Sequence, residues 1–212
     1  MERDKALVEA LLFAAKAFAL SEQFDTPVFI RMTTRTSHAK SVVMLEEPHT
    51  DARHFLGAHR KNGTGENWRA SVLGSFLVHP QRSKFVMLPQ NARNRHPFVE
   101  NRLKKLGAFA DTFERNEIIM QDTSCGIITS GVSYHYARES FPDYSFLKLA
   151  MVYPLPIKKI RQFAAQVKKL YVFEELDPFF EDQIKALGIE VTGKSVFPVC
   201  GEFNPSVAAR GI

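Results

Sequence analysis

Basic side chains that could bind an anion cluster between residues 82 and 105. This segment holds one acidic residue, Glu100, and seven lysines and arginines, namely Arg82, Lys84, Arg93, Arg95, Arg102, Lys104 and Lys105. A local excess of positive charge of this size attracts phosphate groups. A solvated helix face has the same composition, so both interpretations stay open. Nucleic acid is not an expected partner, because base stacking needs aromatic residues among the basic ones and Phe98 is nearly alone there.

A second polar run, from Thr33 to Lys40, directly follows a short apolar stretch. Ser37 and His38 are adjacent in it, and adjacent residues on an extended chain point to opposite faces. We therefore do not expect them to act as a nucleophile and its base. Three other histidines, His49, His54 and His59, recur every five residues. Carboxylate and cysteine partners at ligand spacing are missing around them, which favours a solvated linker over a metal site.

Several common catalytic motifs are absent. The sequence has no GxGxxG, no GxxxxGK[ST] and no G-x-S-x-G. It has no CxxC pair, so this chain cannot build an iron–sulfur cluster by itself. Cys125 and Cys200 are far apart and read as reduced, buried thiols of a cytoplasmic protein. No run approaches the roughly 18 apolar residues of a membrane span, and the first residues lack the pattern of an export signal.

The elements that position these residues follow from the apolar pattern. The chain has 212 residues, 45% of them hydrophobic, a net charge of +5 and a pI near 9.2, which allows a substantial core and an anionic partner. Strands alternate with helices in the second half, as βαβ units with a parallel sheet do. We predict an α/β fold with a mostly parallel open sheet and helices on both faces. The predicted strands are Gly126–Thr129, Phe146–Val152, Leu170–Phe173 and Ile189–Val191, and the helices are Val132–Glu139, Ile157–Val167 and Pro178–Leu187.

Each predicted strand runs into polar residues at its carboxyl end, where open α/β sheets bind ligands. The first strand ends in Thr129 and Ser130, and the third ends in Glu174 and Glu175. The alternative is that Ser130 and Asp177 are ordinary helix N-caps.

The first 45 residues supply too little structure for a core of their own. They predict a helix at Asp4–Gln23 and a strand at Val28–Met32, which together leave most of their apolar surface in water. This segment either docks on the later domain or is part of a larger domain, and we favour the second. Further along we predict an apolar strand at Lys84–Leu88, a helix at Phe98–Phe113, an edge segment at Val196–Val199 and a helix beginning at Pro205.

Five runs together resemble the large (alpha) subunit of indolepyruvate ferredoxin oxidoreductase. They are SEQFDTPVFIRMTTRTSHAKSVV, FVMLPQNARNRHPFVENRLKKL, CGIITSGVSYHYARE, LKLAMVYPLPIKKIRQFAA and LYVFEELDPFFEDQIKALGI. The family subunit is much longer. The resemblance implies that residues 1–45 are the end of a pyrimidine-binding domain and 46–84 a linker. It further implies that 85–203 form a three-layer αβα domain similar to the carboxyl-terminal domain of transketolase, and that 204–212 start a truncated next segment.

The resemblance also implies a reaction and its components. The family decarboxylates aryl pyruvates oxidatively, with thiamine diphosphate, Mg²⁺ and [4Fe-4S] clusters as cofactors and with ferredoxin and coenzyme A as co-substrates. A small (beta) subunit completes the enzyme, and a homodimer contact through the middle domain is expected. The residues that grip the cofactors are expected outside this chain, so we expect no cofactor on it and no activity from it alone.

Two groups of residues are implied to touch the substrate carboxylate or coenzyme A phosphates. A related Arg-Thr-Ser-His run occurs at the same place in pyruvate:ferredoxin oxidoreductases, and Arg35 could pair bidentately with either anion. The alternative is that this run fixes a domain junction. Glu174, Glu175 and Asp177 are expected to hold subunit or domain contacts rather than transfer protons. A stand-alone anion- or nucleotide-binding module that uses residues 82–105 is the competing function. The two groups are Arg31, Thr34, Arg35, Ser37 and His38, and Asn91, Arg93, Arg95 and His96.

Overall fold

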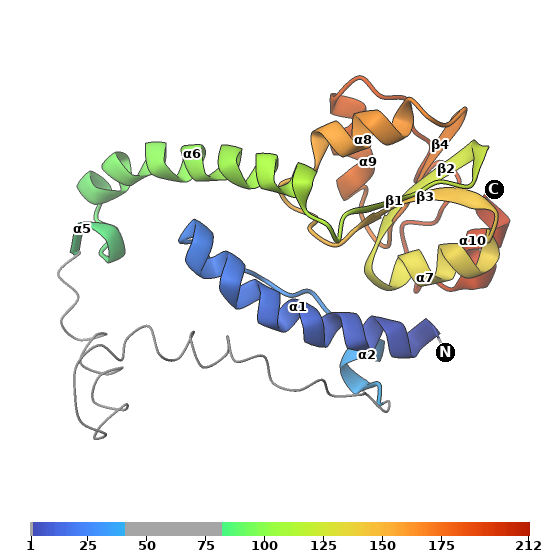
Figure 1. Ribbon diagram of the computed structural model, residues 1–212, viewed down its shortest axis with the longest axis horizontal. Helices are drawn as coiled ribbons and strands as arrows, with labels where there is room; N and C mark the ends of the chain where they lie inside the picture. The colour runs from blue at the N-terminus through green and yellow to red at the C-terminus, as the bar shows by residue number, and fades with distance from the viewer. Residues whose placement is uncertain (1, 41–81) are drawn as a thin grey trace. The chain divides into compact units, whose positions relative to one another are not determined.

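The computed structural model describes residues 2–40 and 82–212. The chain divides into two units, one of Met1–Ser41 with Asn101–Ile212 and one of Val42–Glu100. The larger unit contains the sheet and the helices that cover it (Figure 1). The histidines His49, His54 and His59, and all but the end of the predicted linker 46–84, lie outside the described residues. In the part of the chain that is described, no helix is both long and apolar enough to cross a membrane.

A four-stranded, mostly parallel sheet forms the centre of the larger unit, with the strand order β1-β3-β2-β4. β2 pairs in parallel with both β3 and β4, whereas β1 pairs antiparallel with β3. The three parallel strands confirm the predicted βαβ pattern, and the short β1 was not predicted. The bounds are β1 Glu117–Ile119, β2 Asp122–Ser130, β3 Tyr144–Leu149 and β4 Lys169–Phe173.

Helices cover both faces of this sheet, which confirms the three-layer arrangement (Figure 1). Side chains alternate between the two faces along each strand, so neighbouring residues enter different cores. On one face, Ile128 and Leu147 pack against α8 and α9, and on the other, Ile127 and Phe146 pack against α7 and α10. The bounds are α7 Gly131–Ser140, α8 Ile157–Ala164, α9 Phe179–Ala186 and α10 Pro205–Gly211.

The end of helix α6 (Pro89–Thr112) is fastened to the sheet by buried polar groups. The amide of Asn116 donates to the carbonyl of Ala110 and accepts from the backbone N–H groups of Ala150 and Met151. The carboxylate of Asp111 accepts from the first backbone N–H groups of α8. Because these groups join three elements, they fix where α8 begins relative to the end of α6.

The long first helix, α1 (Glu2–Phe24), matches the helix predicted at Asp4–Gln23. It contacts α7 and also the last turns of α6, where the rings of Phe24 and Phe109 lie 5.2 Å apart. A short helix, α2 (Thr34–His38), follows and contacts α1.

The predicted strand at Val28–Met32 is wrong. This segment has no regular secondary structure, and Phe29 is 92% exposed. An apolar run of strand composition forms a strand only when a neighbour accepts its backbone hydrogen bonds. The sheet formed by the described residues does not include this segment.

Four other predicted elements are corrected. Lys84–Leu88 is not a strand, because helix α5 (Arg82–Phe85) ends within it and residues 86–88 are irregular. The expected strand at Ile189–Val191 is reduced to a single bridge between Tyr171 and Thr192. The segment Val196–Val199 begins in a turn and continues without regular structure rather than pairing as an edge. Helix α6 begins nine residues before the predicted Phe98, since it continues through Pro97.

Candidate functional site

In the polar run around α2, the hydroxyl groups of Thr33 and Ser37 make hydrogen bonds to other residues of the same run. The Thr33 hydroxyl caps α2 by accepting the backbone N–H of Thr36, at 3.3 Å, and the Ser37 hydroxyl donates to the carbonyl of Thr33, at 3.0 Å. The side chains of Arg31, Thr34 and His38 are exposed. Arg35 lies in the first turn of the helix.

The second predicted group lies on α6, in the smaller unit. The side-chain amide of Asn91 donates to the carbonyl of Val86, and the Arg95 guanidinium lies 5.3 Å from the centre of the Phe98 ring. Arg93 is exposed, and His96 Nε2 lies 3.4 Å from Glu100 Oε1. The two predicted groups therefore belong to different units of the chain.

Acidic residues at the carboxyl edge of the sheet hold the fold together. The buried Glu174 carboxylate accepts the backbone N–H groups of Phe180, at 2.8 Å, and Glu181, at 3.0 Å, so it caps α9. Glu175 Oε1 accepts the N–H of Phe203 at 2.7 Å. Both glutamates make these contacts within the sheet domain, so the expectation that they hold subunit or domain contacts stays a prediction.

Neither Asp177 nor Ser130 caps a helix through its side chain in the way that was expected. Asp177 is not the cap of α9, because Pro178 occupies that position and Glu174 supplies the capping carboxylate. Ser130 does occupy the N-cap position of α7, yet its hydroxyl makes no capping hydrogen bond.

Burial and hydrogen bonding shift the pKa values of this acidic edge in opposite directions. Burial raises the pKa of Glu174, although two backbone N–H groups and Lys194 act against the rise. Burial also acts to raise the pKa of Glu181, but hydrogen bonds from Lys185 and the Lys194 backbone outweigh it and lower the pKa. Burial lowers the pKa of Lys194, whose ammonium donates to the carbonyl of Glu174.

These opposite shifts predict opposite dependences of stability on pH. The stability linked to Glu174 is fully present below its ordinary pKa of 4.5 and decreases as the pH rises through its higher pKa in the folded state. The stability linked to Glu181 is present above 4.5 and decreases as the pH falls through its lower folded pKa. Urea unfolding across this pH range measures both effects. In Glu174→Gln the free energy of unfolding should decrease less at higher pH than in the unmodified chain. In Glu181→Gln it should decrease less in acid than in the unmodified chain. The same slope in both variants and the unmodified chain would contradict this assignment.

A buried charged cluster joins α1 to the sheet, and sequence reasoning missed it. The ammonium of Lys148, in β3, donates to Glu9 Oε1 of α1, and His135 Nε2 of α7 lies 4.0 Å from Glu9 Oε2. Lys148 Nζ also lies 4.9 Å from the centre of the Tyr134 ring. The only signal in the sequence was a lysine within an otherwise apolar strand, Phe146–Val152.

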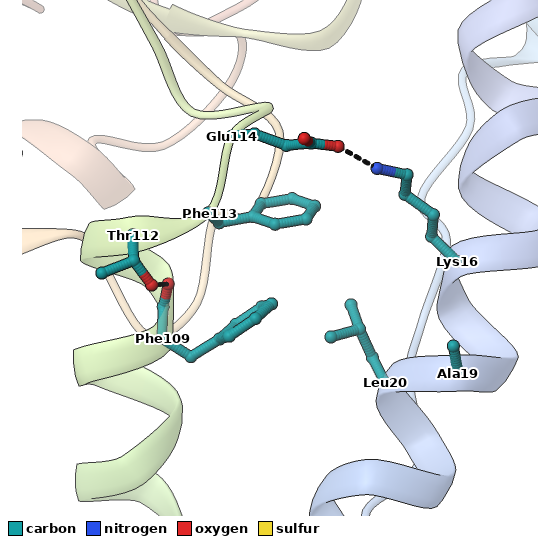
Figure 2. Close-up of a pocket in the computed structure, with 7 residues that line it drawn as sticks. All are labelled: Lys16, Ala19, Leu20, Phe109, Thr112, Phe113 and Glu114. Carbon is teal, nitrogen blue, oxygen red and sulfur yellow. Dashed lines mark hydrogen bonds and ion pairs between the residues drawn. The ribbon is translucent and has the colours of Figure 1, made fainter.

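A shallow pocket of about 350 Å³ opens between α1 and the end of α6 (Figure 2). Its walls are mostly apolar, and Lys16 and Glu114 form an ion pair at one side. The hydrogen bond from Lys16 and its charge lower the pKa of Glu114. The lining residues are Lys16, Ala19, Leu20, Phe109, Thr112, Phe113 and Glu114.

The described residues contain no cluster of metal-ligating side chains. In residues 2–40 and 82–212, no group of three or more histidine, cysteine, aspartate or glutamate side chains could hold a metal ion. These residues therefore do not fit Mg²⁺ with a bound diphosphate, whose ligation needs several oxygen donors in one place.

The comparisons with known proteins point to oxidoreductase subunits. No family model matches the chain. It is similar to the indolepyruvate oxidoreductase subunit IorA of Archaeoglobus fulgidus, with 33% identity over 211 residues, which are 96% of this chain and 31% of that subunit. The IorA subunits of Methanothermobacter thermautotrophicus and Thermococcus kodakarensis are 29% and 32% identical over 96% of the chain, and it covers 32% and 31% of them.

These similarities confirm the resemblance to the alpha subunit of indolepyruvate ferredoxin oxidoreductase. The chain spans about a third of the length of the curated relatives that it matches. A solved structure, 2-oxoglutarate:ferredoxin oxidoreductase from Magnetococcus marinus with 2-oxoglutarate, coenzyme A and succinyl-CoA bound, aligns with a TM-score of 0.44 and 20% identity. The alignment covers 58% of this chain and 23% of that one.

Proposed function

We propose that this chain is a segment of the alpha subunit of a 2-oxoacid:ferredoxin oxidoreductase that acts on aryl pyruvates such as indolepyruvate. The observation that carries the proposal is the 33% identity to an IorA subunit across 96% of the chain. The complete enzyme converts the 2-oxoacid, coenzyme A and oxidised ferredoxin into CO₂, an acyl-CoA and reduced ferredoxin. The small beta subunit and the remainder of the alpha subunit are the proposed partners, in the cytoplasm.

Thiamine diphosphate, Mg²⁺ and [4Fe-4S] clusters are the proposed cofactors of the complete enzyme. Thiamine diphosphate would supply the stabilised carbanion that decarboxylation requires. We propose that its metal site lies in the rest of the enzyme, where the family resemblance implies the metal and diphosphate ligands.

The role we propose for this chain is to position other parts of the enzyme. The sheet is covered on both faces, and the glutamates at its carboxyl edge cap α9 and hold Phe203. Because the carboxylates of Glu174 and Glu175 already accept backbone hydrogen bonds, they stabilise the fold and are poorly suited to proton transfer. A homodimer contact through the α/β domain is part of the same proposal.

An anion-binding role for the two polar groups belongs to the proposal as well. Arg31, with the α2 residues Thr34, Arg35, Ser37 and His38, would face the substrate carboxylate or a coenzyme A phosphate. Asn91, Arg93 and Arg95 of α6 would bind coenzyme A phosphates. The exposure of Arg31, His38 and Arg93 supports this role, because an exposed cation can receive an anionic ligand.

Replacing Arg35 by lysine in the assembled enzyme tests the anion role. A planar guanidinium binds a carboxylate through two hydrogen bonds and an ammonium does not, so we expect KM for the 2-oxoacid or for coenzyme A to rise by roughly tenfold. Lys40→Arg, a few residues away, serves as the matched control and should leave both KM values unchanged. Unchanged KM values in Arg35→Lys would assign the run to the domain junction instead.

The proposed function is tested by exchanging segments. The matched part of the Archaeoglobus fulgidus subunit is replaced by this chain, produced with the small subunit and assayed for ferredoxin reduction with indolepyruvate and coenzyme A. We expect activity from the exchanged enzyme and none from a subunit that lacks the segment. A folded, cofactor-loaded but inactive exchange enzyme would contradict the proposal. Salt-sensitive, micromolar binding of a nucleotide or oligonucleotide by the chain alone would favour the stand-alone binding module.

A further inference from the structure

Lys148 is a buried charge in the middle of the sheet. Only 7% of its surface is exposed, and the residues on either side of it in β3 are buried and apolar. It lies on the same face as Phe146, two residues earlier. A buried ammonium requires an anionic partner. The carboxylate of Glu9, in α1, accepts a hydrogen bond from the Lys148 ammonium. The positive charge of Lys148 is thus balanced by Glu9, a residue far away in the sequence.

Two further polar groups converge on the same place. His135 Nε2 lies 4.0 Å from the second oxygen of Glu9. Thr129 is the cross-strand neighbour of Lys148, on the same face of the sheet, and such neighbours lie about 5 Å apart. The Thr129 side chain is fully buried, and among the described residues its hydroxyl has no hydrogen-bond partner. A buried hydroxyl without a partner is uncommon and points to a missing acceptor.

The chemistry of these groups matches a carboxylate. Ammonium, imidazole and hydroxyl groups can all donate, and the two oxygens of a carboxylate can accept about four hydrogen bonds. Glu9 is held by the backbone of α1. Its Oε1 accepts a hydrogen bond from Lys148, and its Oε2 lies 4.0 Å from His135 Nε2, which is longer than a hydrogen bond. Among the described residues, neither oxygen accepts a hydrogen bond from the Thr129 hydroxyl. A small carboxylate that is not tethered to α1 is free to turn toward the Thr129 hydroxyl as well.

We propose that Lys148, His135 and Thr129 form a carboxylate-binding site on the sheet, which the Glu9 side chain occupies as an internal ligand. A small free carboxylate and Glu9 compete for this site. Binding of such an anion and seating of the first half of α1 therefore exclude each other. The proposal stands on the geometry of this cluster and is independent of the proposed function.

The Glu9→Ala variant of the full chain, titrated with acetate at constant ionic strength, tests this site. A ligand that binds only the folded chain stabilises it in proportion to its occupancy. We expect acetate to raise the melting temperature of Glu9→Ala saturably, by at least about 2 °C relative to chloride. The unmodified chain should not respond, because Glu9 fills its site.

Two control variants decide where acetate acts. Glu9→Ala combined with Lys148→Met should lose the response, because the central cation is gone. Glu114→Ala removes the exposed carboxylate partner of Lys16 and should respond to acetate no more than to chloride. The proposal is overturned if Glu9→Ala does not respond, or if the double variant responds as strongly as the single one.

A second measurement keeps the test informative if Glu9→Ala does not fold. Glu9→Gln preserves the shape of the side chain and removes its charge. Acetate should then shift the ring resonances of His135 saturably in NMR spectra, while the resonances of His96, which lies in the other unit, stay in place. A linear or absent shift at His135 would overturn the proposal.

Discussion

Replacing Asn116 by alanine is expected to lower the free energy of unfolding of the larger unit by about 3–5 kcal/mol. Asn116 is buried, and its side chain makes three hydrogen bonds that join the end of α6 to the end of β3. Alanine leaves two backbone N–H groups and one carbonyl without partners, and each such buried group costs about 1–3 kcal/mol. Urea unfolding, followed by circular dichroism, measures the loss.

An exposed asparagine within α6 provides the control. Asn94→Ala should change the free energy of unfolding by no more than about 0.5 kcal/mol, because Asn94 is solvated. A loss below about 1 kcal/mol in Asn116→Ala would mean that water or a shifted backbone replaces the amide. The fastening of α6 to β3 would then have to be assigned to other contacts, such as those of Asp111 and Lys159.

The second large effect is expected from Phe173→Ala, at about 4–5 kcal/mol. Phe173 is buried at the end of β4, and its ring lies 4.9 Å from the ring of Phe197 and 4.7 Å from that of Phe203. Removing a buried phenylalanine costs about 3–5 kcal/mol, and each aromatic pair adds about 0.5–1.5 kcal/mol. The cavity lies where the segment that leads into α10 packs on the sheet.

This location gives the Phe173 variant a local signature. Amide hydrogen exchange should accelerate in α10 (Pro205–Gly211) more than in α8, which packs on the opposite face. Phe29→Ala, at a site that is 92% exposed, should change the free energy of unfolding by at most about 0.5 kcal/mol. Equal acceleration in α8 and α10, or a loss below about 1.5 kcal/mol, would contradict this account of the core.

The interior of the fold could be predicted because the sequence pattern there is strong. The apolar runs of β2, β3 and β4 are short and separated by helical patterns, so strand type and parallel pairing follow from local signals. Gly188 has a positive φ of 76° just after α9, as expected for a glycine that ends a helix.

The failures have physical causes as well. β1 has only three residues and exists because β3 offers it an edge, which no local pattern records. A proline normally interrupts a helix, but α6 continues through Pro97. The expected strand at Val28–Met32 had the right composition and lacks a neighbour among the described strands.

The candidate site was harder to predict than the fold. Lys148 and Glu9 are 139 residues apart in sequence, so neither residue alone indicates the pair. Arg35, Arg93 and Arg95 were selected by residue type and family resemblance, and their ligands remain predictions. The glutamates after β4 were expected to hold subunit or domain contacts, whereas Glu174 caps α9, a role that depends on how the chain turns back into that helix.

Calorimetric titration of this chain with thiamine diphosphate and Mg²⁺ tests the central claim most directly, namely that the chain positions other parts of an enzyme and does not carry its cofactor. We predict no measurable heat of binding, since the described residues offer no group of side chains for the metal. Saturable binding with a micromolar or lower dissociation constant would contradict the claim and assign the cofactor site to this chain.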